Sequence, residues 1–192
     1  MKQNKLLDVM PECYVDTGLI EYLLSAGVNH QHCCAKVVGQ LKTTFADRFA
    51  IGIIDKDKVQ LGYIRECEAI VKTEHLTLMR HRSNHQYLIT IAPAVDKFII
   101  DCANKQGVNL EIFRLPSELK SFTKVSKSVA SSSDTRFRAL FAAIKDNPEI
   151  RALKRRWSIC VIINTHPTVS AYRRYSKAYK SSEERANKKC VI

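Results

Sequence analysis

The sequence predicts an α/β fold: a three-layer architecture with a mostly parallel sheet, helices on both faces, and a helical C-terminal extension. Strand-like apolar runs alternate with amphipathic helical patterns, an order that produces parallel sheets. Residues 49–54 are apolar at every position, which is typical of a strand buried on both faces. A length of 192 residues suits one such domain with an appendage. We therefore expect an α/β domain at 1–130 and a basic, mainly helical extension at 131–192 packed on the same domain.

The N-terminal half supplies two strands and two helices to this prediction. Residues 12–16 (ECYVD) read as a short strand. Apolar residues then recur at helical spacing over 19–24, and Gly27 stops that run. A second amphipathic helix is expected over 34–45. The buried strand at 49–54 follows it.

The middle of the chain predicts two more strands and a helix. Residues 76–79 and 87–92 have strand-like patterns. Pro93 suits a first helical turn, and the apolar residues that follow it define a helix with a core face over 95–102. Residues 108–113 alternate like a further strand.

From there the pattern turns mostly helical. Residues 115–125 share one apolar face. Asp134 closes a serine-rich loop as an N-cap, and the residues over 137–144 fall at the spacing of a buried stripe. Asn147-Pro148 begins another helix. Its apolar spacing leaves open whether 158–164 continues that helix or forms a strand.

Positive charge is concentrated near the C-terminus. The net charge is +12, and the segment from Arg151 to the end, with eleven Lys or Arg and two Glu, carries +9 of it. Such a concentration is typical of proteins that bind nucleic acid, because each phosphate contact releases counterions. A solubilising tail explains it equally well. Arg155 and Arg156, expected on the outward face of the helix, are the candidates for holding a nucleic-acid backbone.

The composition predicts a cytoplasmic protein without a membrane partner. No apolar stretch approaches the length of a membrane span, and residues 1–13 lack the apolar core of a secretory signal. The seven cysteines have no paired spacing. Most lie inside apolar patterns, which favours reduced core thiols over disulfides.

An acidic motif follows the buried strand. Alternate residues of an extended segment point the same way, so Asp55 and Asp57 can reach one cation while Lys56 points elsewhere. Ligands gather outside the carboxyl ends of the strands in open α/β sheets, and oxygen ligands favour Mg²⁺ or Mn²⁺. Asp16, at the end of the expected first strand, is the natural third metal ligand. The alternative is a strand-end turn, which aspartate also favours.

At these residues the sequence resembles the TOPRIM domain of topoisomerases, bacterial primases, recombination proteins and nucleases of the overcoming-lysogenization-defect type. An acid followed by a helix (YVDTGLIEYLL), a second helix, and an apolar strand ending in Asp-x-Asp (IGIIDKDK) carry the resemblance. The segment YLITIAPAVDKFII resembles the strand and acidic helix of the nuclease branch. The resemblance covers about residues 12–105.

The resemblance implies a TOPRIM-like sheet and Mg²⁺-dependent phosphodiester chemistry on nucleic acid, with DNA favoured over RNA. It implies that the metal ligands and acid/base groups are Asp16, Asp55, Asp57 and Asp96. The nucleic-acid-binding candidates are Lys56, Lys58, Arg80, Arg82, Arg155 and Arg156.

Two other functions stay open beside this one. The family's first acid is usually a glutamate followed by glycine, whereas Asp16 is followed by Thr17, so a noncatalytic nucleic-acid-binding relative is one alternative. A protein-interaction or regulatory domain with a basic tail is the other.

Histidines define two weaker motifs. His30-x-His32-Cys33-Cys34 gathers four ligands suited to soft metals, of which two or three can face one point at a helix start, with no matching pair at zinc-finger spacing. His81 and His85 flank an expected hairpin loop, RHRSNHQ. That loop could contact phosphate, or His85 could transfer protons, although exposed loop histidines more often do neither.

Overall fold

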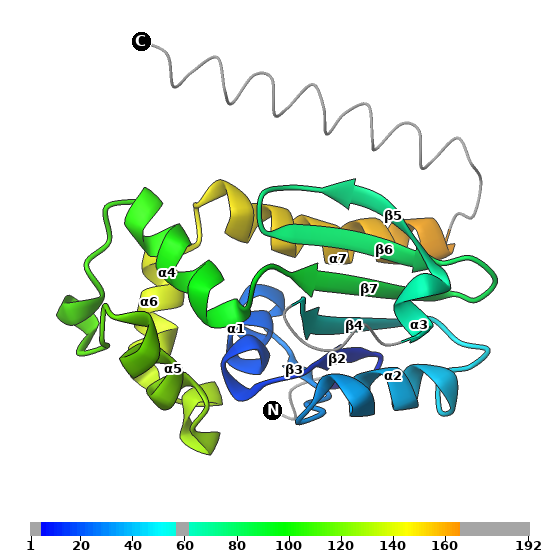
Figure 1. The fold of residues 1–192 in the computed structure, drawn as a ribbon, viewed down its shortest axis with the longest axis horizontal. Helices are drawn as coiled ribbons and strands as arrows, with labels where there is room; N and C mark the ends of the chain where they lie inside the picture. The colour runs from blue at the N-terminus through cyan, green and yellow to red at the C-terminus, as the bar shows by residue number, and fades with distance from the viewer. Residues whose placement is uncertain (1–4, 57–61, 166–192) are drawn as a thin grey trace, which may run out of the picture.

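A five-stranded sheet forms the centre of the protein (Figure 1). The computed structural model describes residues 5–56 and 62–165. In spatial order the strands are β2 (Val9–Pro11), β4 (Ala50–Asp55), β7 (Gln86–Ile91), β6 (Leu76–His81) and β5 (Cys67–Lys72). β2, β4 and β7 are parallel, and β6 is antiparallel to both of its neighbours. Four of the five strands therefore run in one direction, as expected for a mostly parallel sheet. β1 (Lys5–Leu6) and β3 (Gly27–Val28) form a separate parallel pair.

Helices cover both faces of the sheet. They are α1 (Tyr14–Leu24), α2 (Cys34–Lys42), α3 (Gly62–Arg65), α4 (Val95–Lys105), α5 (Leu119–Ser126), α6 (Thr135–Ile144) and α7 (Pro148–Thr165), with 3-10 helices η1 (Leu110–Phe113) and η2 (Val129–Ser132). Figure 1 shows α1, α4, α5 and α6 gathered at the end of the sheet toward which the arrows of β4 and β7 point.

The side chains of β4 alternate between two hydrophobic clusters. Ile51 and Ile53 join the large cluster that includes residues of α1, α4, α6 and α7. Ala50 and Ile54 join a smaller cluster with residues of α2 and α3. All six residues of β4 are buried. The three-layer arrangement and the buried strand predicted at 49–54 are thus confirmed.

Two strand predictions are wrong. Residues 12–16 are not a strand: β2 ends at Pro11 and α1 begins at Tyr14, because Val15 belongs to the helical stripe that continues along α1. Residues 108–113 are not a strand either. The side chain of Asn109 accepts a hydrogen bond from the backbone N–H of Glu111 and starts η1, a local bond that competes with strand pairing.

Other predicted elements are confirmed. The strands at 76–79 and 87–92 pair as an antiparallel hairpin. The helices expected over 34–45 and 95–102 form, although the first of them ends at Lys42. Asp134 caps α6 by accepting the Arg136 N–H at 2.8 Å. The strand β5, at the sheet edge, was not predicted, because its apolar run is only three residues long (69–71) and most of its side chains are exposed or half-buried.

Helix α7 settles the open question at 158–164 and corrects the prediction for Arg156. The segment continues the helix. Arg156 does not face outward: it is 1% exposed. Its Nη2 donates to the Leu76 carbonyl oxygen at 3.0 Å and to Thr73 Oγ1 at 3.2 Å. This arginine joins α7 to the start of β6, so it is not placed to bind nucleic acid.

The part of the C-terminal extension that the structure describes packs into the main core. Phe137 of α6 and Ile150 of α7 belong to the same cluster as the sheet residues Ile51 and Ile89. Within the described residues, none of the helices combines the length and apolarity needed to cross a membrane.

Gly52 allows α2 to approach the sheet closely. A Cβ atom at this position would lie 2.6 Å from Val37 Cγ1 and 2.8 Å from Leu88 Cδ2, distances that real Cβ atoms do not tolerate. Val37 and Leu88 are both fully buried, so neither side chain can move aside without disturbing its neighbours. The absence of a side chain at Gly52 therefore sets the distance between α2 and β4.

Gly52→Ala is expected to lower the free energy of unfolding by about 1 to 3 kcal/mol, because it overpacks this interface. Chemical denaturation of the purified protein measures the change. Gly39→Ala is the matched control, since a Cβ there meets no atom within 4 Å and alanine favours a helix interior by up to about 1 kcal/mol. Equal stabilities for the two variants would contradict the close-approach argument.

Candidate functional site

The carboxyl ends of the parallel strands meet the starts of two helices. Only Glu12 and Cys13 separate β2 from α1. β7 leads through Pro93 into α4, which begins at Val95 rather than at the proline. Because β4 lies between β2 and β7, its last residue, Asp55, is brought between these two helix starts.

Asp55 is bonded to both neighbouring segments. Its Oδ1 accepts the backbone N–H of Val95 at 2.9 Å, so the carboxylate caps α4, whose own N-cap residue gives no side-chain hydrogen bond. Its backbone N–H donates to Glu12 Oε2 at 3.2 Å. The helix N-terminus favours a negative charge at this position.

Glu12, Cys13 and Asp55 form a candidate metal centre. One ligand atom from each side chain lies within 4.8 Å of the other two. Glu12 is 1% exposed. Two carboxylates and a thiol that converge in this way could hold one cation.

Asp16 lies beside this centre, but on α1 rather than at a strand end. Its Oδ2 accepts the N–H of Glu12 at 3.2 Å and its Oδ1 accepts the N–H of Thr17 at 2.8 Å. Burial raises the pKa of Asp16 well above its ordinary value, and the charges of Asp55 and Glu12 raise it further. Both oxygens are thus committed to the backbone at the start of α1, and its role as a ligand stays a prediction.

Asp96 borders a cavity beside Asp55. The cavity, of about 300 Å³, is lined by residues of the α1 start, of α4 and of α5, including Cys13, Asp55, Asp96, Lys97 and Lys127. The hydroxyl of Ser126 donates to Asp96 Oδ1 at 2.6 Å. The structure therefore brings Asp96 and Asp55 to one cavity, although Asp96 is not part of the three-residue cluster.

Not all predicted site residues can be located. Asp57 and Lys58 lie outside the described residues. Lys56 follows Asp55 directly and is exposed. Arg155 is exposed on α7, whereas Arg156 is buried, as described above.

Arg80 and Arg82 are not at this site. Arg80 lies opposite Tyr87 in the β6–β7 ladder, and Tyr87 lies opposite Ile51 of β4. Arg80 is thus level with a residue four positions before Asp55, roughly 13 Å away along the sheet. Arg82 lies beyond it in the hairpin turn, so any phosphate contact there is separate from the acidic cluster.

Sequence reasoning missed Glu12, Cys13, Lys97 and Lys127. Placing the strand at 12–16 made Asp16 its final acid, and the glutamate at the true strand end was overlooked. The spacing of Val15 with Leu19 was the signal that the helix starts earlier. Lys97 and Lys127 gave no comparable signal, because α4 and α5 meet only in the folded chain.

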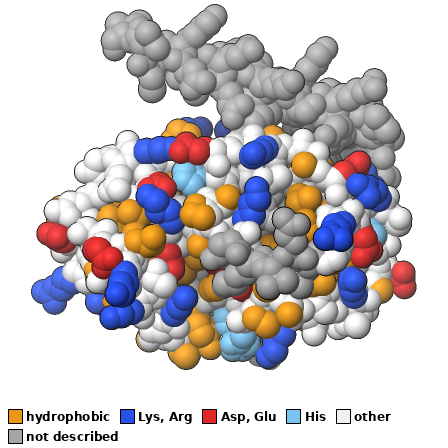
Figure 2. All heavy atoms as spheres, in the orientation of Figure 1, with side chains coloured by type: hydrophobic (Ala, Val, Ile, Leu, Met, Phe, Trp, Pro, Cys, Tyr) orange, Lys and Arg blue, Asp and Glu red, His pale blue; other side chains and the backbone are white. Residues whose placement is uncertain are grey.

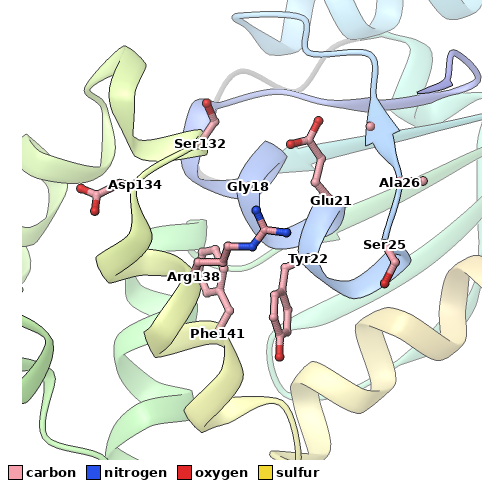
Figure 3. A pocket seen from close by; sticks show the side chains of 10 residues that line it. Gly18, Glu21, Tyr22, Ser25, Ala26, Ser132, Asp134, Arg138 and Phe141 are labelled. Carbon is pink, nitrogen blue, oxygen red and sulfur yellow. The ribbon is translucent and has the colours of Figure 1, made fainter. Parts of the chain in front are cut away.

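A second cavity, of about 210 Å³, lies between α1 and the η2–α6 segment. Figure 3 shows Arg138 extending across it toward Gly18 and Glu21 of α1. The two carboxylates that line this cavity have structural roles. Glu21 Oε1 accepts the Val28 N–H at 3.1 Å, and Asp134 caps α6. This cavity is therefore a space between packed helices. The cavity beside Asp55 is the better candidate for an active site.

Comparison of this chain with protein-family models, curated proteins and solved structures found no match.

Glu12→Gln is expected to stabilise the metal-free protein by on the order of 1 kcal/mol. The change removes one of the charges that repel Asp55 and Asp16, while the amide oxygen can still accept the Asp55 N–H. Because the folded-state pKa of Asp16 is raised above 3.8, ionisation of Asp16 destabilises the fold as the pH rises above that value. The advantage should therefore be present at neutral pH and vanish in acid.

Denaturation in a chelating buffer at several pH values measures this effect. Glu68→Gln, on the exposed edge strand β5, is the matched control and should leave stability unchanged. A Glu12→Gln protein that is less stable than the wild type at neutral pH would contradict the repulsion argument.

Proposed function

We propose that the protein is a cytoplasmic, metal-dependent nuclease-like enzyme with a TOPRIM-like fold that acts on phosphodiester bonds of nucleic acid, DNA in preference to RNA. The observation that supports this most directly is the convergence of Glu12 and Asp55 at the carboxyl ends of two adjacent parallel strands. Phosphodiester chemistry needs such an acidic centre beside a space for the phosphate, and the cavity next to Asp55 supplies that space.

The corrected position of the first acid strengthens the resemblance to TOPRIM domains. That family's first acid is usually a glutamate followed by glycine, and here a glutamate, Glu12, directly follows the last residue of β2. Cys13 stands where the family has glycine. In this proposal Glu12 and Asp55 are the principal acids, Asp57 is a third ligand, and Asp16 supports the start of α1 behind them.

The donor set suits Mg²⁺ or Mn²⁺. Carboxylate oxygens are the ligands these ions prefer, and the thiol of Cys13 makes the softer Mn²⁺ the better fit of the two. When bound, such an ion polarises a phosphoryl oxygen and lowers the pKa of a nearby water.

The residues around the cavity position the substrate. Lys97 and Lys127 line it, and each offers a positive charge to a phosphate. Lys97 also pairs with Asp101 at 2.5 Å, which fixes the direction of its side chain. Asp96, held by Ser126, borders the same space and is the candidate for accepting or returning a proton.

One observation favours the noncatalytic alternative. The carboxylates of Asp55 and Asp16 already accept backbone N–H groups, and capping alone would explain why aspartates stand at these positions. In that case the protein would bind nucleic acid without cleaving it, and the experiment below separates the two.

Asp55→Asn is expected to reduce Mn²⁺-dependent nicking of supercoiled plasmid DNA by at least about 100-fold, because it removes a metal-binding charge. The asparagine oxygen can still cap α4, so the fold should persist. Conversion of supercoiled to nicked circles on agarose gels measures the rate. Asp47→Asn, a surface change of the same kind, is the matched control and should retain full activity.

The outcomes distinguish the alternatives. Nicking that is equal in Asp55→Asn and wild type would refute the enzyme proposal. Salt-sensitive DNA binding without nicking would favour the noncatalytic relative. Absence of both would leave the protein-interaction alternative.

Lys127→Gln is expected to weaken DNA binding at low salt and to reduce the slope of log affinity against log salt by about 1, as expected for one lost phosphate contact. Fluorescence anisotropy with labelled duplex DNA at several salt concentrations measures both quantities. Lys145→Gln, exposed just after α6, controls for the change in net charge. If the two substitutions weakened DNA binding equally, the DNA would not contact the cavity through Lys127.

A further inference from the structure

Two histidines and a tyrosine meet at the surface beside the start of α2. His30 and His32 follow β3, and Tyr14 is the first residue of α1. Figure 2 shows a patch of histidine side chains at the lower edge of the molecule in this region. The Tyr14 and His30 rings stack with centroids 4.3 Å apart. This His–Tyr cluster (Tyr14, His30, His32) has no part in the proposed nuclease function.

Three polar atoms of the cluster converge on one point. His30 Nε2 lies 3.1 Å from His32 Nδ1, and the Tyr14 hydroxyl lies 3.2 Å from the same His32 Nδ1. A ring nitrogen has a single in-plane site, either a lone pair or an N–H. It cannot satisfy both partners at once, so the arrangement brings together more hydrogen-bonding groups than the protein alone can pair.

The protonation of His30 follows from its other contact. Thr17 Oγ1 donates its one hydrogen to the Cys13 carbonyl at 2.6 Å. The contact of 2.8 Å between Thr17 Oγ1 and His30 Nδ1 must then be an Nδ1–H donated to the hydroxyl. The Nε2 of neutral His30 consequently carries a lone pair directed toward His32. Metal-binding histidines are held in this way, with the second ring nitrogen donating to an oxygen.

The backbone supports the same arrangement. His32 has a φ of +71°, a left-handed conformation that few non-glycine residues adopt. In this conformation the His32 ring lies edge-on to the His30 ring, with the ring centroids 4.2 Å apart.

We propose that His30 Nε2 and His32 Nδ1 bind a divalent transition-metal ion of the Zn²⁺ class, with the Tyr14 hydroxyl adjacent. With Zn–N distances of about 2.0 to 2.1 Å, tetrahedral ligands lie roughly 3.3 Å apart, close to the 3.1 Å separation of the two nitrogens. An open cavity of about 630 Å³ adjoins the histidines, so water can complete the coordination. Lys36, the charged residue in its lining, is exposed to solvent, and its repulsion is screened.

The site is chemically distinct from the acidic centre. Imidazole nitrogen favours Zn²⁺, Ni²⁺ or Cu²⁺, whereas the carboxylates of Glu12 and Asp55 favour Mg²⁺ or Mn²⁺. The two proposals can therefore fail separately, and excess Mg²⁺ in the experiment competes for the acidic centre while Zn²⁺ binding to the histidines is measured.

Calorimetric titration of the full chain with Zn²⁺, in excess Mg²⁺, tests the proposal. One Zn²⁺-binding event should disappear in His30→Ala and in His32→Asn; asparagine is chosen because it tolerates a positive φ. Thr17→Val, which removes only the oxygen that orients His30, should weaken the same event by about 10- to 100-fold.

Controls separate this site from other metal-binding groups. The event should persist in His85→Ala, which removes an exposed histidine from the β6–β7 turn, and in Asp55→Asn, which disables the acidic centre. X-ray absorption of the Zn²⁺ complex should show nitrogen ligands. Zn²⁺ binding unchanged in His30→Ala and His32→Asn, absent in the wild type, or through sulfur alone would overturn the proposal.

Discussion

The crowding of carboxyl groups at one end of the sheet is the constraint around which this part of the fold is built. Glu12, Asp16 and Asp55 are all buried, and the charges of Asp55 and Glu12 disfavour ionisation of Asp16. The backbone compensates: the N–H groups of Val95 and Thr17 point at Asp55 and Asp16. Helices α1 and α4 both begin here, so the N–H groups of their first turns offset part of the cost of burying negative charge.

This arrangement links stability to binding. A cation would neutralise the repulsion that the metal-free protein has to tolerate, so the same carboxylates that reduce stability would supply the binding energy. The His–Tyr cluster is comparable, but its groups are neutral. There a cation would bind hydrogen-bonding groups that the protein cannot pair, instead of charges that repel one another. Both clusters adjoin α1, at Cys13 and Tyr14, so the start of one helix organises two different donor sets.

The sequence predicted those features that depend on local pattern. The wholly apolar 49–54 segment identified the buried strand, and Asp55 at its end was correctly placed at the carboxyl edge. The error at 12–16 arose because a strand of three residues is too short to show a two-residue periodicity. With the strand boundary misplaced, Asp16 was predicted as the acid at the strand end instead of Glu12. The burial of Arg156 could not be foreseen, because its partner carbonyl at Leu76 is eighty residues distant. Contacts of this kind depend on tertiary packing, and charge pattern alone predicts solvent exposure.

The brevity of the connection between β2 and α1 limits how this protein can diverge. Two residues, Glu12 and Cys13, form the whole link, and both contribute to the three-residue cluster. An inserted or deleted residue would turn α1 by about 100° relative to the sheet and would separate the acids and the tyrosine from their partners together. The turn at 82–85 is at the opposite end of the sheet, and a change in its length would not move the acids or the tyrosine. Length variation among descendants of this chain should accumulate there.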